Sequence, residues 1–271
     1  MRSECACASG QGVALEAERV SLVSSLKLRS QHASAVLVAL VAGLGLCVPL
    51  LARELAGFDP AMPPGTSCQV AIEKVHPTQF AVGYWEVKQR AANIARHGPG
   101  RLEIYEEEHL ALLVVGPGGV PYLVDGHHLC LAMLKAGRGT TVEARVVANW
   151  RDLPVAEFWS KMRETNYVYP YDNHGRGPLE VEKLPKKVTE LTDDPYRSLA
   201  WAVRNRGGFQ KTMVSFAEFQ WANFFRKRIG ISQKGKGFEK AVEAALKVSH
   251  TDEAKNLPGY TPKAGTPSKP E

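Results

Sequence analysis

A β-hairpin that runs directly into a helix constrains the fold of this chain more than any other feature of its sequence. Two apolar runs rich in β-branched residues, 111–115 and 120–124, are joined by a Gly-Pro-Gly-Gly turn. This pattern predicts two antiparallel strands with a tight connection. Asp-Gly-His-His follows at residues 125–128, and a helix is predicted over 129–135 with Gly137 at its end.

The Asp-Gly-His-His turn is the candidate site. Gly126 permits a tight strand-to-helix turn and lets a ligand approach the backbone. The free N–H groups and the dipole at the start of the helix favour an anion there. His127 and His128 could add proton transfer, positive charge or metal ligation, and Asp125 could orient an imidazole or hold a cation. The structural alternative is that Asp125 caps the helix and one histidine packs in the core.

A second constraint is the uncharged segment 33–52, which is long enough to cross a bilayer as a helix. Lys27 and Arg29 precede it, and a basic flank before an apolar run is typical of secretory signals and signal anchors. That charge order would place the C-terminal part outside the cytoplasm. We therefore expect an exported protein that is periplasmic, secreted or membrane-tethered. A cleaved signal, an anchor and a buried helix of a soluble domain all remain open.

The rest of the chain divides by composition. We expect a polar extension over 1–32, a Pro/Gly-rich linker over 53–68, a core over 69–150, a helical extension of the same domain over 151–249, and a disordered tail over 250–271. Outside the hairpin unit, strands are predicted over 69–75 and 142–147, and helices over 82–97, 155–163, 196–204, 214–228 and 238–248.

Composition and cysteine usage narrow the classes of protein. With 271 residues, of which 44% are hydrophobic and 23% charged, the chain is neither a collagen, a coiled coil nor wholly disordered. A net charge of +6 is compatible with a phosphate-bearing partner. The cysteines lack CxxC or zinc-finger spacing, so we do not expect a structural zinc site. Cys68 and Cys130 could form one disulfide outside the cytoplasm, which the sequence leaves open.

Three ordered groups of motifs resemble the ParB-like nuclease branch of the ParB/sulfiredoxin superfamily. The central group is Val-Asp-Gly-His-His-Leu at 124–129, with Ala132 on the helix. The flanking groups are His-Pro-Thr-Gln at 76–79 with Val-Gly at 82–83 and Glu-Val-Lys at 86–88 upstream, and Asp-Pro-Tyr-Arg-Ser-Leu-Ala-Trp at 194–201 with Phe-Ala-Glu-Phe at 216–219 and Trp-Ala at 221–222 downstream. The resemblance covers roughly residues 70–229.

This resemblance implies a small α/β (α+β) fold with a mixed sheet, whose glycine turn grips the phosphate of a nucleotide or nucleic acid. It also implies phosphodiester hydrolysis. Asp125, His127 and His128 would then be catalytic, with one imidazole as general base or metal ligand and the other stabilising the phosphate or the leaving group. A divalent ion (Mg²⁺, Mn²⁺ or Zn²⁺) or a nucleotide is the candidate cofactor.

Further residues are candidates for the same site. We expect phosphate contacts from Gly126, Thr78, Gln79, Lys88 and Arg197, and a second polar lobe from Asp172 and His174. Each has a structural alternative: turn capping for Thr78 and Gln79, solvation for Lys88, bracing of the C-terminal helices for Arg197, and a surface Asx turn for the loop around Asp172.

The chain also departs from parts of the superfamily. His127 stands where sulfiredoxins carry cysteine, and Cys130 lies three residues further on, so reductase chemistry is not expected. Leu129 replaces the arginine of sulfiredoxins and partition proteins, which weakens a triphosphate grip. The sequence shows no helix-turn-helix pattern, so we do not expect sequence-specific DNA binding. The first hypothesis is therefore a phosphate-binding, phosphodiester-hydrolysing domain. The alternatives are a nucleotide-dependent kinase of small hydroxyl compounds and a catalytically silent binding module.

Overall fold

The computed structural model of the protein describes residues 55–98, 110–232 and 236–262. The polar extension (1–32) and the uncharged segment (33–52) expected from the sequence lie outside these ranges. Among the residues described, no helix combines the length and the hydropathy that a bilayer span requires.

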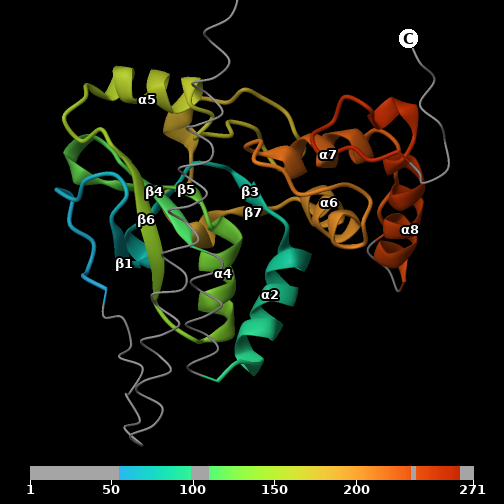
Figure 1. Cartoon of the computed structure of the whole chain (residues 1–271), viewed down its shortest axis with the longest axis horizontal. Helices are drawn as coiled ribbons and strands as arrows, with labels where there is room; N and C mark the ends of the chain where they lie inside the picture. The colour runs from blue at the N-terminus through green and yellow to red at the C-terminus, as the bar shows by residue number, and fades with distance from the viewer. Residues whose placement is uncertain (1–54, 99–109, 233–235, 263–271) are drawn as a thin grey trace, which may run out of the picture. The chain divides into compact units, whose positions relative to one another are not determined.

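A five-stranded mixed sheet forms the centre of the described chain (Figure 1). Its order is β1 (Ser67–Ala71), β6 (Thr141–Asn149), β4 (Ala111–Val115), β5 (Pro121–Asp125) and β2 (His76–Pro77). β4 and β5 pair antiparallel as the predicted hairpin, and β1 is antiparallel to β6. The β6–β4 and β5–β2 pairs are parallel. The expectation of a mixed α/β fold is confirmed.

Six α-helices accompany the sheet within the described ranges: α2 (Tyr84–Arg96), α4 (His127–Ala136), α5 (Val155–Glu164), α6 (Pro195–Asn205), α7 (Ala217–Arg226) and α8 (Gly237–Ser249). Every predicted helix is present, with ends that differ by three residues or fewer. The largest difference is at the start of α7, where Phe216 has a left-handed backbone with φ of 58°. A residue in that conformation cannot lie inside a right-handed helix.

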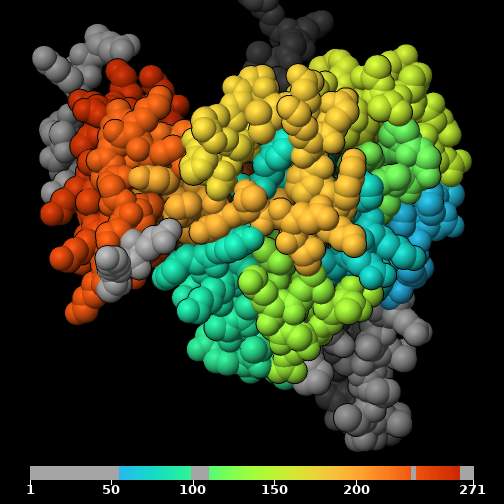
Figure 2. Space-filling model, turned by 180° about the vertical axis from the view of Figure 1, so that it is seen from behind, coloured from blue at the N-terminus to red at the C-terminus, as the bar shows by residue number. Residues whose placement is uncertain are grey.

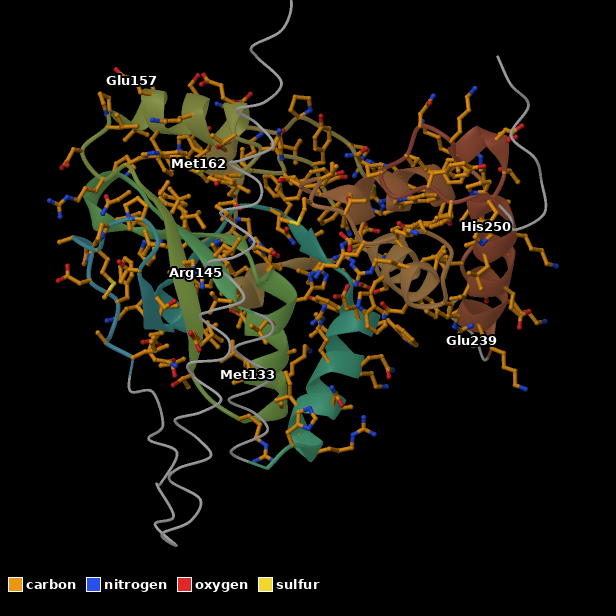
Figure 3. The ribbon with its side chains drawn as sticks, in the orientation of Figure 1. Met133, Arg145, Glu157, Met162, Glu239 and His250 are labelled. Carbon is orange, nitrogen blue, oxygen red and sulfur yellow. The ribbon has the colours of Figure 1, made fainter. Side chains whose placement is uncertain are left out.

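The sheet is covered on both faces because successive residues of a strand point to opposite sides. Leu113 belongs to the hydrophobic cluster that includes Met133 of α4, whereas Val114 belongs to the cluster that includes Met162 of α5. Figure 3 labels both methionines, and both are buried. From the opposite side, the segment between α5 and α6 covers the junction between the sheet and the C-terminal helices (Figure 2).

The C-terminal helices have a core of their own, and the chain after α8 adds to it. Leu257 and Tyr260 pack against the cluster that contains Trp221, and the indole Nε1 of Trp221 donates to the carbonyl of Pro258 at 2.8 Å. The expectation of disorder from residue 250 onward is therefore wrong as far as residue 262, because these two side chains bury apolar surface. Residues 263–271 lie outside the described chain.

Three of the helices begin where strands end. β3 (Ala81–Val82) leads into α2, and β7 (Thr192–Asp193) leads into α6. Since β3 and β7 are parallel neighbours, α2 and α6 start side by side. β5 leads into α4, which packs alongside α2 (Figure 1). The N-termini of these three helices therefore meet at one place, and the candidate site lies there.

Candidate functional site

Gly126 makes the turn between β5 and α4 possible. Its φ of 97° is in the left-handed region, and a Cβ at this position would lie 3.0 Å from Cα of Ala111. Asp125 is exposed, and its Oδ1 accepts from the N–H of Gly126 at 2.7 Å. Within the part of the chain that the structure describes, no side chain caps α4. Asp125 therefore shapes the turn without satisfying the N–H groups of the first helical turn.

His127 is a core residue that ties the loop after β2 to this turn. Its exposed fraction is 3%, and its Nε2 accepts from the N–H of Thr78 at 3.2 Å. The Thr78 hydroxyl in turn donates to the carbonyl of Leu123 at 2.8 Å. Burial lowers the pKa of His127 to about 3, against a smaller opposite effect of a hydrogen bond with the Leu123 backbone. The imidazole is therefore neutral at physiological pH.

His128 points toward the start of α2 rather than into the core of the sheet. Its Nε2 accepts from the N–H of Gly83 at 3.0 Å and lies 3.4 Å from Oε2 of Glu86. Burial lowers the pKa of His128 well below its usual value, and the neighbouring cations, Arg197 first among them, lower it further. Because the ring is neutral, its contact with Glu86 is not an ion pair.

Glu86 is the centre of a buried charge cluster. The carboxylate has an exposed fraction of 1%, with Arg90 Nε and Arg197 Nη1 each at 2.8 Å. Nη2 of Arg197 also lies 4.0 Å from Glu218, which pairs with Arg204. Among the described residues the cluster therefore includes three guanidinium groups and two carboxylates.

Arg197 is nearly enclosed by these partners. Its guanidinium lies 5.5 Å from the ring centroid of Phe219, and its exposed fraction is 8%. The buried Nε has no hydrogen-bond partner within the described chain. Arg197 braces α6 against α2 and α7, which is one of the two roles expected from the sequence. The other role, a phosphate contact, stays a prediction, for which the Nε–H is the unused donor.

The N-terminus of α2 is closed by side chains from other elements. Tyr84 N–H donates to Asp193 Oδ1 at 2.8 Å, and Trp85 N–H donates to the hydroxyl of Ser198 at 3.2 Å. His128 accepts from Gly83, as described above. A Cβ on Gly83 would lie 2.7 Å from the backbone nitrogen of Ser198, so α2 and α6 touch here. At the start of α4, in contrast, no side chain of the described residues accepts from the first N–H groups.

The structure places the remaining sequence candidates apart from this turn. Gln79 is buried and its Nε2 donates to the carbonyl of Ala81 at 2.6 Å, which is turn capping. Lys88 is exposed on α2. Asp172 accepts from the N–H groups of His174 at 2.8 Å and Arg176 at 2.9 Å, which is an Asx-type turn.

The electrostatics of that loop agree with a structural role. Burial alone would raise the pKa of Asp172, but the hydrogen bonds from Arg176 and His174 lower it. The neighbouring Asn173 donates to the carbonyl of Asp193 at 3.0 Å, which ties the loop to β7. His174 itself is exposed.

Neither a metal cluster nor a disulfide is formed by the described residues. No group of three or more His, Cys, Asp or Glu side chains in these ranges could hold a metal ion. Cys68 and Cys130 are both buried free thiols. Burial raises the pKa of Cys130 to about 12.

Two buried acidic residues of the sequence motifs have roles that the sequence does not reveal as part of the site. Glu86 stands in the Glu-Val-Lys motif, and Asp194 opens the downstream motif. Asp194 is fully buried, caps α6 by accepting from Tyr196 N–H at 2.9 Å, and pairs with Arg226 at 2.8 Å. The Asp-Pro pair at a helix start signals that cap. The i,i+4 spacing on a helix indicates the pair of Glu86 with Arg90, but no local signal indicates its contacts with Arg197 and His128.

Comparison with known proteins finds a matching family and a similar solved structure. Residues 68–227 match the family described as "Putative ParB-like nuclease". The crystal structure of protein Atu1540 from Agrobacterium tumefaciens is similar, with a TM-score of 0.67 and 36% sequence identity over 74% of this chain and 99% of that chain. A search of curated proteins finds no match. The match covers more than half of the chain and includes all three groups of motifs, so this chain belongs to the ParB-like nuclease family.

Proposed function

We propose that this protein binds a phosphate-bearing ligand, a nucleotide or a nucleic acid, at the N-terminus of α4. The observation that carries the proposal is the contrast between two adjacent helix starts. Side chains of Asp193, Ser198 and His128 accept from the first N–H groups of α2, whereas no side chain of the described residues accepts from those of α4. Uncapped N–H groups at a helix start bind phosphate oxygens readily.

Two features around the turn favour an anion and one opposes it. The dipole of α4 places a partial positive charge at its first residues, His127 and His128. Besides burial, the guanidinium groups of Arg197, Arg90 and Arg204 lower the pKa of His128 in the first turn of α4, so their positive charge reaches this turn. The exposed carboxylate of Asp125 repels an anion. It fits a divalent ion only as one ligand beside phosphate oxygens, as Mg²⁺ is often bound.

Phosphodiester hydrolysis is the second candidate, and His128 is the observation that favours it. His128 lies in the first turn of α4, with its Nε2 3.4 Å from Oε2 of Glu86 of α2, and its lowered pKa keeps it unprotonated, as a general base must be. A base of such low pKa accepts a proton poorly, and the N–H of Gly83 already occupies Nε2. The geometry therefore supports binding better than catalysis. We also propose export, on the basis of the uncharged segment 33–52. Export supports neither phosphate binding nor hydrolysis over the other.

Binding is tested by titrating the full chain with inorganic phosphate, with ADP and with a single-stranded oligonucleotide, and following backbone amide shifts by NMR. We expect the largest shifts at residues 126–129. Asp125→Asn should tighten phosphate binding about threefold or more, because it removes the repelling charge, and the control Asp152→Asn should change nothing. Shifts confined to other residues, or no effect of Asp125→Asn, would contradict the proposal.

Hydrolysis needs a separate assay. The full chain is incubated with single- and double-stranded DNA and RNA under Mg²⁺, Mn²⁺, Zn²⁺ or chelator, beside His128→Gln and His127→Gln. Loss of cleavage in His128→Gln, with phosphate binding retained, would assign the base. Equal cleavage by all three proteins would mean a contaminant, and no cleavage would leave a binding module.

A further inference from the structure

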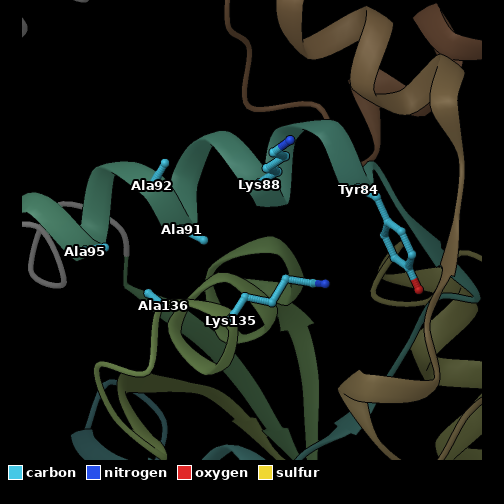
Figure 4. Close-up of a pocket in the computed structure, with 7 residues that line it drawn as sticks. All are labelled: Tyr84, Lys88, Ala91, Ala92, Ala95, Lys135 and Ala136. Atoms are coloured by element: carbon cyan, nitrogen blue, oxygen red, sulfur yellow. The ribbon is translucent and has the colours of Figure 1, made fainter. Parts of the chain in front are cut away.

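A trough of about 620 Å³ lies between α2 and α4, away from the turn at Gly126 (Figure 4). Its floor is made of small side chains, Ala91 and Ala95 from α2 and Ala136 from α4. Lys88 of α2 and Lys135 of α4 contribute the charged groups. In Figure 4 the Lys135 side chain extends toward Tyr84, and its Nζ lies 5.5 Å from the centroid of that ring.

The charge on these two helices is one-sided. α2 carries a single carboxylate, Glu86, which is buried and paired, and α4 carries none. Their exposed charged side chains, Lys88, Arg96 and Lys135, are all basic. An occupant of the trough that carries carboxylates would therefore meet a lysine on each wall, and neither helix presents an exposed carboxylate to it.

The shape of the trough favours an extended occupant rather than a small molecule. Small-molecule sites are enclosed and carry several convergent polar groups, whereas this floor offers only methyl groups. Along α2 the lining residues recur at helical spacing, from Tyr84 through Lys88 and Ala91 to Ala95. They follow one stripe of a helix about 20 Å long. Small side chains on such a stripe let a second helix pack closely.

We propose that this trough is a docking site for an acidic amphipathic helix of a partner protein. The apolar stripe of the partner would bury the alanine floor, and its carboxylates would pair with Lys88 and Lys135. A nucleic-acid backbone would satisfy the lysines but would leave the floor uncovered, since it has no apolar stripe. The proposal does not depend on phosphate binding at Gly126.

The test uses a fluorescein-labelled synthetic peptide of about 15 residues, helical, with leucine and alanine on one stripe and glutamate elsewhere. Binding to the full chain is followed by anisotropy. We expect binding that weakens with salt, and a loss of tenfold or more with Lys88→Glu/Lys135→Glu. The control Lys240→Glu/Lys247→Glu, an equal change of charge at two exposed positions of α8, should bind like the parent.

Two further peptides and one competitor complete the design. A scrambled peptide of the same composition, and one with glutamine in place of glutamate, should bind at least tenfold more weakly. Equal binding of either peptide, or an unchanged affinity of the double variant, would overturn the proposal. So would an oligonucleotide that displaces the peptide and loses its own binding in the double variant. Binding of inorganic phosphate at residues 126–129 should stay unchanged in that variant, which separates the two proposals.

Discussion

Glu86 and Arg197 form a buried ion pair, with 2.8 Å between Oε2 and Nη1, that joins the first turn of α2 to the first turn of α6. Arg90 holds the other carboxylate oxygen at 2.8 Å, and His128 lies 3.4 Å from Oε2. Through these contacts, Glu86 connects the first turns of α2, α6 and α4.

Replacement of Glu86 by glutamine should destabilise the fold strongly. The change leaves Arg197 buried without its counter-charge, and breaking a buried pair in this way costs about 3–5 kcal/mol. Urea unfolding would measure the loss. Glu239→Gln breaks the exposed pair with Arg206 and serves as the matched control, with an expected cost of about 0–1 kcal/mol. Equal losses of stability in the two variants would show that the buried pair contributes no more than the exposed pair.

Acid should destabilise the protein through His127. Its folded pKa of about 3 is below the unfolded value near 6.5, so the unfolded state binds more protons between these values. This histidine's contribution is complete above pH 6.5 and decreases as the pH falls toward 3. The loss at pH 5 is about 2 kcal/mol. His128, whose pKa is also lowered, adds to it in the same direction.

Urea midpoints at pH 7 and pH 5 would show this effect. His127→Gln keeps an acceptor for the N–H of Thr78 but does not titrate, so its midpoint should depend less on pH. His174→Gln alters an exposed ring and should retain the parent's pH dependence. If both variants behave like the parent, His127 is not the group responsible.

Gly83→Ala should separate α2 from α6. The added methyl group would lie 2.7 Å from the backbone nitrogen of Ser198, which cannot move without shifting α6. We expect a loss of about 1–3 kcal/mol, as for other overpacked sites. Gly98→Ala is the control, since nothing lies within 4 Å of its Cβ. Thermal unfolding of the two variants would distinguish a steric effect from a general effect of alanine.

The thiols of Cys68 and Cys130 should be unreactive in the native protein. Both are buried, and burial raises the pKa of each, that of Cys130 to about 12, so little thiolate exists at pH 8. In a chain with Cys5, Cys7 and Cys47 changed to serine, a thiol reagent should modify neither cysteine before urea is added and both afterwards. A mass lower by about 2 Da without reductant would instead indicate a disulfide.

Local patterns determined the secondary structure well. The hairpin at β4 and β5 follows from two apolar runs around a glycine-rich turn, and α4 ends at Gly137, whose left-handed backbone caps it. Both signals depend on residues close together in the chain, so the sequence carries them completely. The motifs around Asp125–His128 likewise identified the family before any fold was known.

The roles of individual side chains were decided only by tertiary structure. His127 and His128 are adjacent in the sequence. His127 nevertheless bonds to the N–H of Thr78 after β2, whereas His128 bonds to the N–H of Gly83 at the start of α2. Lys88, expected at the phosphate, lies in the trough between α2 and α4. Glu86 and Arg197 are 111 residues apart, and no periodicity relates them. Burial and ion pairing depend on which helices pack together, and that is a property of the whole fold rather than of any local segment.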